Sequence, residues 1–132
     1  MGAVSTFNGA HRFLSNFYPA RISFEGEIYP TVEHVYQAAK TRVPEERARI
    51  RRARTPGAAK HLGRRVTLRP DWEASKLVVM LRLVRLKFSH AELARLLVAT
   101  GSRELVEGNY WGDTFWGQCP VGHGFNHLGK IL

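Results

Sequence analysis

Apolar and polar positions follow a helical period along residues 32–40. Four apolar positions are spaced i, i+3, i+4 and i+7, which predicts one buried stripe on an amphipathic helix. These positions are Val32, Val35, Tyr36 and Ala39. Three polar positions spaced i, i+4 and i+7 form a second face. They are Glu33, Gln37 and Lys40. Thr31 is a good N-cap, so Glu33 lies in the first turn, where the helix dipole favours a negative charge.

This polar face has two interpretations. Charged positions at helical spacing are most often solvated surface. However, an aromatic loop at residues 13–19, with the sequence FLSNFYP, precedes the helix and carries Asn16. Binding residues are common in loops that carry polar and aromatic groups. The polar face is therefore either a solvated ladder or part of a site.

Shorter signals predict the other elements before residue 72. Alternating positions at residues 21–24 and 27–29 predict a β-hairpin that turns at Glu25-Gly26. Pro44 and the pair Thr55-Pro56 suit helix starts, and they predict helices at residues 44–53 and 57–62, with Gly63 as a stop. Residues 66–68 read as extended.

The second half of the chain is mostly helical in pattern. A helix at residues 72–88, capped by Asp71, is apolar on many sides, which predicts a central core helix. A capping box from Ser89 to Glu92 opens a helix at residues 91–99, and Gly101 closes it. Residues 102–107 read as a further helical turn or two, and residues 128–132 as a terminal one. We expect one α+β domain over residues 1–132, mostly helical, with a small β-hairpin.

Residues 109–127 form a long predicted loop, rich in glycine and aromatic residues. A loop of this length in a compact domain is usually functional or disordered. The aromatic residues argue against disorder. The loop is therefore a candidate for part of a site.

Composition narrows the class of protein. The chain has 132 residues, of which 44% are hydrophobic and 23% charged, as in ordinary soluble globular proteins. No apolar run reaches the length of a membrane span, and the first residues lack the pattern of a signal peptide. One cysteine rules out an internal disulfide and fits a reducing compartment. We expect a cytoplasmic protein without membrane partners.

The net charge is +9, and much of it lies in residues 42–69, which hold ten basic residues against two acidic ones. A basic surface attracts polyanions, including nucleic acid. Solubility or a bias toward arginine explains the same composition. The net charge therefore indicates the sign of a partner's charge and not the partner's identity.

An ordered set of short motifs runs through nearly the whole chain. They are the FLSNFYP loop, Gly26, Tyr29, Glu33-His34, Tyr36-Gln37-Ala38-x-Lys40, Thr55-Pro56, Ala59-Lys60, Gly63-Arg64, Asp71-Trp72, Lys87-Phe88, Ala99-Thr100-Gly101, Leu105-Val106-Glu107, Asp113-x-x-Trp116-Gly117 and Asn126-x-Leu128-Gly129. In this order they resemble the YbiA-like family, also called the NADAR superfamily. No single motif is decisive, but the ordered set is specific. The resemblance implies a YbiA-like fold and N-glycosidase activity on ribosylated bases.

Such a site has recognisable chemical needs. By analogy with glycoside hydrolysis, cleavage between a base nitrogen and ribose C1′ passes through an oxocarbenium-like state. The site therefore needs a carboxylate near the sugar, an aromatic surface for the base and polar groups for hydroxyls and phosphates. The resemblance points to Glu33 and Asp113 as carboxylates and to Trp72 and Trp116 as stacking residues. Further binding candidates are Asn16, Phe17, Gln37 and Lys40.

The roles within this set stay open. Glu33 at a helix start should ionise easily, which suits a base or a charge stabiliser, whereas burial would favour the protonated form of Asp113. Which carboxylate activates water does not follow from the sequence. Each residue also has a structural interpretation: Trp72 and Trp116 could fill the core, and Asp113 could cap a turn. Trp111-Gly112 is an alternative motif pair, although the three-residue spacing from Asp113 favours Trp116.

A metal centre or a cofactor is not expected. Cys119, His123 and His127 are spaced four apart, but Pro120, Gly122 and Gly124 between them disfavour the helix that would align them. Gly122-x-Gly124 lacks the strand and helix of a dinucleotide fingerprint.

Two substrates fit the resemblance. The favoured one is ADP-ribose attached to guanine in nucleic acid, because of the basic surface. The alternative is a phosphoribosylated pyrimidine intermediate of riboflavin biosynthesis. A different class of function is non-catalytic binding of ADP-ribose or nucleic acid. We expect the site in a cleft between the helix at residues 32–40, the start of the helix at residues 72–88 and the loop at residues 109–127.

Overall fold

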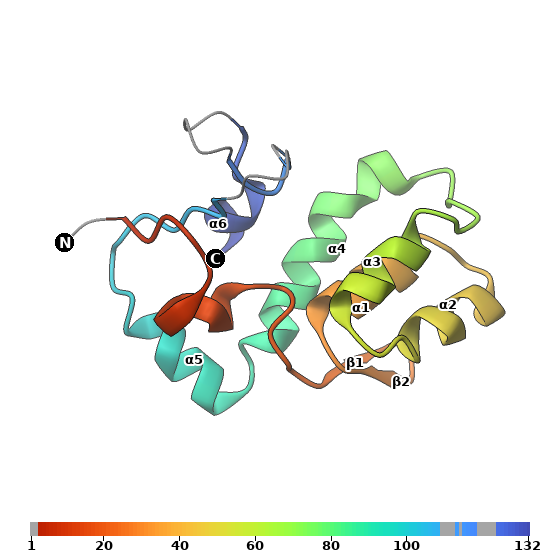
Figure 1. Ribbon diagram of the computed structural model, residues 1–132, viewed down its shortest axis with the longest axis horizontal. Coiled ribbons are helices and arrows are strands. Elements are labelled where there is room, and N and C mark those ends of the chain that lie inside the picture. The colour runs from red at the N-terminus through yellow and green to blue at the C-terminus, as the bar shows by residue number, and fades with distance from the viewer. Residues whose placement is uncertain (1–2, 109–112, 114, 119–123) are drawn as a thin grey trace. The chain divides into compact units, whose positions relative to one another are not determined.

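The computed structural model describes residues 3–108, 113, 115–118 and 124–132. The chain divides into two compact units (Figure 1). Unit 1 consists of Met1–Ser15 and Phe88–Leu132, and unit 2 consists of Asn16–Lys87.

Unit 2 begins with a two-stranded antiparallel hairpin. Strand β1, Ile22–Phe24, pairs with β2, Glu27–Tyr29, in the register Ile22↔Tyr29. Both residues of the connecting turn have positive φ, 48° at Glu25 and 86° at Gly26. Two positive φ values are typical of the type I′ turns that match the twist of a hairpin. The hairpin predicted at Glu25-Gly26 is therefore confirmed.

Four helices complete unit 2. They are α1 (Val32–Ala39), α2 (Pro44–Arg51), α3 (Pro56–Gly63) and α4 (Trp72–Lys87). The predicted caps of the first and third are present, since the hydroxyls of Thr31 and Thr55 accept hydrogen bonds from backbone N–H groups three residues on. Gly63 is the last residue of α3 and does not stop it, because Arg64 is the C-cap. Residues 66–68 form no strand.

The central helix of unit 2 is α1, not α4. All eight residues of α1 are buried, and it packs against α2, α3, α4 and both strands. In α4 only one face is buried, with Met80, Leu83 and Val84 on it, while Leu77 and Val78 are 41% and 69% exposed. The prediction that residues 72–88 form the central core helix was therefore wrong. The number of apolar residues in a helix does not show whether other elements surround that helix.

Unit 1 contains a 3₁₀ helix, η1 (Gly9–Leu14), and the helices α5 (Ala91–Val98) and α6 (His127–Ile131). The N-cap of α5 is His90, whereas the predicted capping box places the N-cap one residue earlier, at Ser89. Residues 102–107 form no helix, so the helix predicted there was wrong. Leu105 forms a parallel bridge with Val4, and Val4 N–H donates to Glu104 O at 2.8 Å. A partner about a hundred residues away thus supplies the hydrogen bonds that a helix would have made locally.

The observed elements confirm the predicted class of an α+β fold that is mostly helical with a small β-hairpin. Among the described residues, no helix is long and apolar enough to span a membrane. The prediction of one domain over residues 1–132 stays a prediction.

Candidate functional site

The start of α1 is tied to the aromatic loop. The backbone N–H of Glu33 donates to the carbonyl of Asn16 at 3.1 Å, and the N–H of His34 donates to the Thr31 hydroxyl at 3.1 Å. These N–H groups would otherwise lack partners at a helix start. The side chain of Asn16 points elsewhere, with Nδ2 lying 3.6 Å from Sδ of Met80 on α4. Asn16 therefore holds Glu33 in place through its backbone.

The polar face of α1 is not a solvated ladder. Glu33 is 7% exposed and Gln37 is 3% exposed. The amide Nε2 of Gln37 donates to Oε1 of Glu33 at 3.0 Å. A buried carboxylate needs such donors, because burial without them is costly. The interpretation as a surface ladder is excluded, and Glu33 with Gln37 forms a buried, ordered pair.

Lys40 follows this pair one turn later, at the C-cap of α1. It is half-buried, and its Nζ lies 5.7 Å from the ring centroid of Tyr36. Burial lowers the pKa of the Lys40 amine, and nearby cations such as Lys60 lower it further, while the carboxylate of Glu33 raises it. A lowered pKa increases the fraction of neutral amine, which is the basic and nucleophilic form. Lys40 can thus act as a cation toward a phosphate or as an amine.

Trp72 lies at the start of α4 and packs against α1. Its ring centroid is 5.1 Å from that of Tyr36, with the planes at 57°, and the residue is 4% exposed. This contact is typical of a core aromatic pair. The structural interpretation of Trp72 therefore has direct support, and its use as a stacking surface stays a prediction. Phe17, in contrast, is 43% exposed on the aromatic loop.

Asp113 and Trp116 belong to unit 1. Oδ1 of Asp113 accepts hydrogen bonds from the N–H groups of Phe115, at 3.2 Å, and Trp116, at 3.0 Å. Asp113 thus caps the turn that presents Trp116. The indole of Trp116 meets Phe115 edge-on, with centroids 4.7 Å apart, and lies 6.3 Å from the ring of His127. The alternative motif residue Trp111 lies outside the described residues.

The predicted site residues fall into two groups. Six of them belong to unit 2 and lie on α1, at its C-cap, on the aromatic loop or at the start of α4. They are Asn16, Phe17, Glu33, Gln37, Lys40 and Trp72. Asp113 and Trp116 form a second local group in unit 1. The convergence of the two groups on one cleft stays a prediction.

Comparison with known proteins gives this geometry a context. Residues 5–132 match the profile of the NADAR domain. The chain belongs to the NADAR domain family. It is 41% identical over 121 residues to the N-glycosidase YbiA of Shigella boydii, covering 89% of this chain and 75% of that protein. It is 42% identical over 124 residues to the N-glycosidase Npun_R5314 of Nostoc punctiforme, covering 89% of this chain and 79% of that protein.

Two further similarities extend the comparison. The riboflavin biosynthesis protein VVA0006 of Vibrio vulnificus is 41% identical over 125 residues, covering 92% of this chain, but the chain spans only 34% of its length. The NMR structure of the Escherichia coli protein YbiA matches with a TM-score of 0.85 at 37% identity, covering 99% of this chain and 82% of that one. The predicted resemblance is confirmed, and the predicted class of enzyme agrees with the names of these relatives.

Two motif residues of this NADAR domain are structural. His34 is 1% exposed; its Nδ1 lies 2.7 Å from the Thr31 hydroxyl, and its Nε2 lies 3.0 Å from the carbonyl of Ala53. Because a carbonyl only accepts, Nε2 carries the proton. Burial lowers the pKa of His34, which favours this neutral form. Asn126 likewise binds backbone, donating from Nδ2 to Leu105 O at 2.9 Å and accepting from Glu107 N–H at 2.9 Å.

Lys87 is a buried ionisable residue that was not among the predicted site residues, although it belongs to the motif Lys87-Phe88. It is 1% exposed at the end of α4, with Nζ 5.8 Å from the ring centroid of Tyr18 on the aromatic loop. Burial lowers the pKa of its amine to about 7. A signal was present, since Lys87 continues the buried stripe of Met80, Leu83 and Val84 at i+7.

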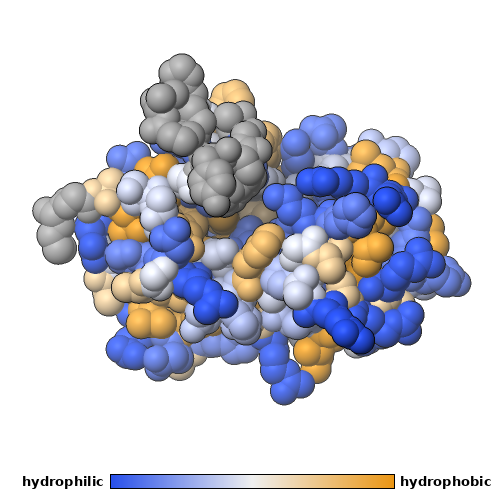
Figure 2. All heavy atoms as spheres, viewed as in Figure 1, coloured by the Kyte–Doolittle hydropathy of each residue, from blue (hydrophilic) through white to orange (hydrophobic). Residues whose placement is uncertain are grey.

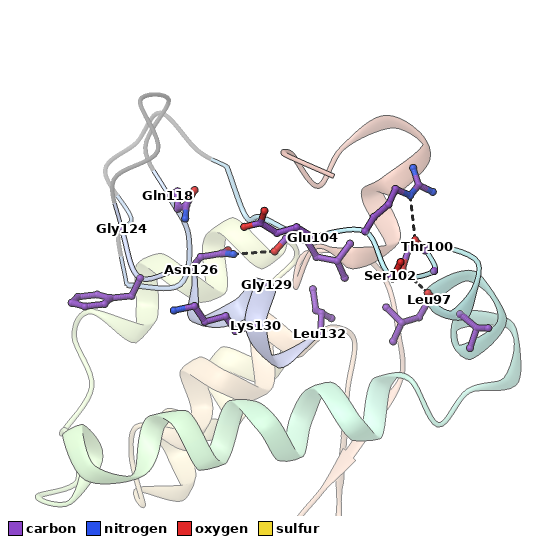
Figure 3. Close-up of a pocket in the computed structure, with 15 residues that line it drawn as sticks. Leu97, Thr100, Ser102, Glu104, Gln118, Gly124, Asn126, Gly129, Lys130 and Leu132 are labelled. Atoms are coloured by element: carbon purple, nitrogen blue, oxygen red, sulfur yellow. Dashed lines mark hydrogen bonds between the residues drawn. The ribbon is translucent and has the colours of Figure 1, made fainter. Parts of the chain in front are cut away.

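A hollow of about 480 Å³ lies within unit 1 (Figure 3). Ser102, Glu104, Gln118, Asn126 and Lys130 are among its lining residues. None of the predicted site residues, all of which are described, lines it.

Among the described residues, no group of three His, Cys, Asp or Glu side chains could hold a metal ion. Cys119 and His123 lie outside those residues, while His127 begins α6 and stacks on Phe125 at 5.4 Å.

Proposed function

We propose that this NADAR domain hydrolyses the bond between ribose C1′ and a base nitrogen. The observation that carries the proposal is the buried Glu33 carboxylate, which accepts a hydrogen bond from Gln37 and lies about two helical turns before the half-buried Lys40. The N-glycosidase names of relatives at 41–42% identity support it.

In the proposed reaction, Glu33 stabilises the positive charge that develops at C1′ or accepts a proton from the attacking water. Water forms the new bond to C1′, the C1′–N bond breaks, and the base leaves with the electron pair and takes up a proton. Lys40 binds a phosphate of the substrate through its cationic form. Trp72 and Trp116 are the proposed contacts to the base, and Asp113 is the second proposed carboxylate.

For the substrate, we propose ADP-ribosylated guanine in nucleic acid. Hydrophilic residues gather over α2 and α3 in the view of Figure 2. Exposed cations of this region include Arg49, Arg52, Arg54, Arg64 and Arg65. A surface of this kind favours a polyanionic substrate.

A second candidate substrate is a phosphoribosylated pyrimidine intermediate of riboflavin biosynthesis. The names of relatives from Vibrio vulnificus and Zea mays, both called riboflavin biosynthesis proteins, favour it. The same carboxylate chemistry serves both substrates, because both carry a ribose C1′–nitrogen bond.

One experiment tests the function and ranks the substrates. The protein is incubated separately with an oligonucleotide that carries ADP-ribosylated guanine and with the riboflavin intermediates, and the released sugar is measured by mass spectrometry. We expect release from one of them. Release from neither substrate would remove the proposal.

The variant Glu33→Gln separates an enzyme from a binding protein. General acid–base groups contribute roughly 100- to 10,000-fold, so turnover should fall by a factor in that range while the substrate still binds. The matched control is Glu73→Gln, since Glu73 also lies in the first turn of a helix of unit 2 but has a side chain that is 80% exposed. The control should keep full turnover. A protein that binds without turnover in its wild-type form is instead a reader of ADP-ribose.

A further inference from the structure

Gly63 lies where α3 passes closest to the polar face of α1. The residue is buried, and a Cβ placed on it would lie 1.9 Å from Oε1 of Gln37, 2.7 Å from its Cδ and 3.0 Å from its Cβ. An added methyl group would have to displace the amide of Gln37, so glycine serves close approach here and not backbone freedom. The amide of Gln37 therefore rests directly on the backbone of Gly63.

The orientation of that amide has a cost. Oε1 of Gln37 is buried and accepts no hydrogen bond from the described residues. Buried polar atoms are seldom left in this state, because they lose their hydrogen bonds to water without replacement. Turning the amide over would not help, since Oε1 would then face Oε1 of Glu33, which is also an acceptor. The bond to Glu33 thus decides the orientation, and Gly63 provides the space for the unpaired oxygen.

We propose that Gln37 and Gly63 are positioning residues for Glu33. Gln37 holds the Glu33 carboxylate in one orientation through its Nε2 donor, and Gly63 holds Gln37 in place because it has no side chain. The catalytic consequence of this arrangement rests on the proposed function of Glu33, whereas the arrangement itself does not.

Two variants test the roles of Gln37 and Gly63 separately. Gln37→Met keeps the length of the side chain but removes both the donor and the unpaired oxygen. Removing the unpaired acceptor favours the fold, whereas the Glu33 carboxylate loses a donor, so urea unfolding must first show that the variant is folded. Gly63→Ala keeps the amide but displaces it. A misplacement of about 1 Å can cost roughly 100-fold in rate, so both variants should lose turnover on this scale with little change in KM.

The chain offers a matched control on the same helix. An added Cβ at Gly57 of α3 would meet nothing nearer than 3.9 Å, where Thr55 Oγ1 lies. Gly57→Ala should therefore leave turnover unchanged. The double variant Gly63→Ala/Gln37→Met should lose no more activity than the worse of its single variants, because both changes break the same bond.

Side-chain amide resonances of Gln37 provide a readout that needs no substrate. They are assigned by their loss in Gln37→Met. We expect them to shift in Glu33→Gln and in Gly63→Ala and to stay in place in Gly57→Ala. If they do not move in Gly63→Ala, or if a folded Gln37→Met retains wild-type turnover, the positioning roles are refuted. If these variants show the expected shifts but the wild-type protein has no turnover, only the proposed function is refuted.

Discussion

Replacing Lys87 by methionine should stabilise the protein near neutral pH. The amine is 1% exposed, and burial lowers its pKa from 10.5 to about 7. A difference of one pH unit in pKa corresponds to about 1.4 kcal/mol, so full protonation of Lys87 costs the folded state about 5 kcal/mol relative to the unfolded chain. Methionine has a similar shape without the charge, and it fills irregular sites in a core. Lys87→Met should therefore raise the free energy of unfolding at pH 7.

The pH dependence gives the sharper test. Between about pH 7 and 10.5 the unfolded chain binds more protons at Lys87 than the folded protein does, so the stability of the wild type rises with pH. From pH 7 to pH 9 this one group should add about 2 kcal/mol. Below pH 7 both states are protonated, and the full cost is present. The advantage of Lys87→Met should accordingly shrink by about 2 kcal/mol between pH 7 and pH 9.

Urea unfolding followed by circular dichroism at pH 6, 7, 8 and 9 measures the difference. Comparing the variant with the wild type removes the contribution of every other titrating group. The control is Lys76→Met on the same helix, whose ammonium pairs with Glu73 at 2.9 Å and whose side chain is 18% exposed. This control shows whether removing any lysine of α4 has the same effect. An advantage of Lys87→Met that stays constant from pH 7 to pH 9 would mean that Lys87 is protonated in the folded protein over this range.

Three further outcomes are expected. Because burial lowers the pKa of His34, the wild type should lose stability as the pH falls below 6.5, and His34→Gln should lose less on acidification, as measured by urea unfolding at pH 7 and pH 5. Gly129→Ala should lower the melting temperature of the protein markedly, since its Cβ would lie 2.0 Å from Leu105 O; an unchanged melting temperature would contradict the close packing. If α2 and the segment after it contact phosphates, the double variant Arg52→Gln/Arg54→Gln should reduce the salt slope of duplex binding by up to about 1.8, and an unchanged slope would place the contact elsewhere.

Local signals determined most of the element boundaries. The hydroxyls of Thr31 and Thr55 cap their helices as predicted, because capping depends on groups within three residues along the chain. The hairpin is similarly local: Glu25 and Gly26 both adopt positive φ in a two-residue turn. The predicted helix at residues 102–107 failed because its backbone partner, Val4, lies far away in the sequence.

For the candidate site, the sequence by itself identified the residue types and the helix that carries Glu33, Gln37 and Lys40. It could not decide whether their face is solvated, since periodicity describes the direction of a side chain and not what packs against it. Only the tertiary structure, by setting the bare backbone of Gly63 against Gln37, turned a polar helix face into a buried carboxylate–amide pair. Burial depends on the surroundings, and α1 is surrounded by strands β1 and β2 and by helices α2, α3 and α4, which lie elsewhere in the chain.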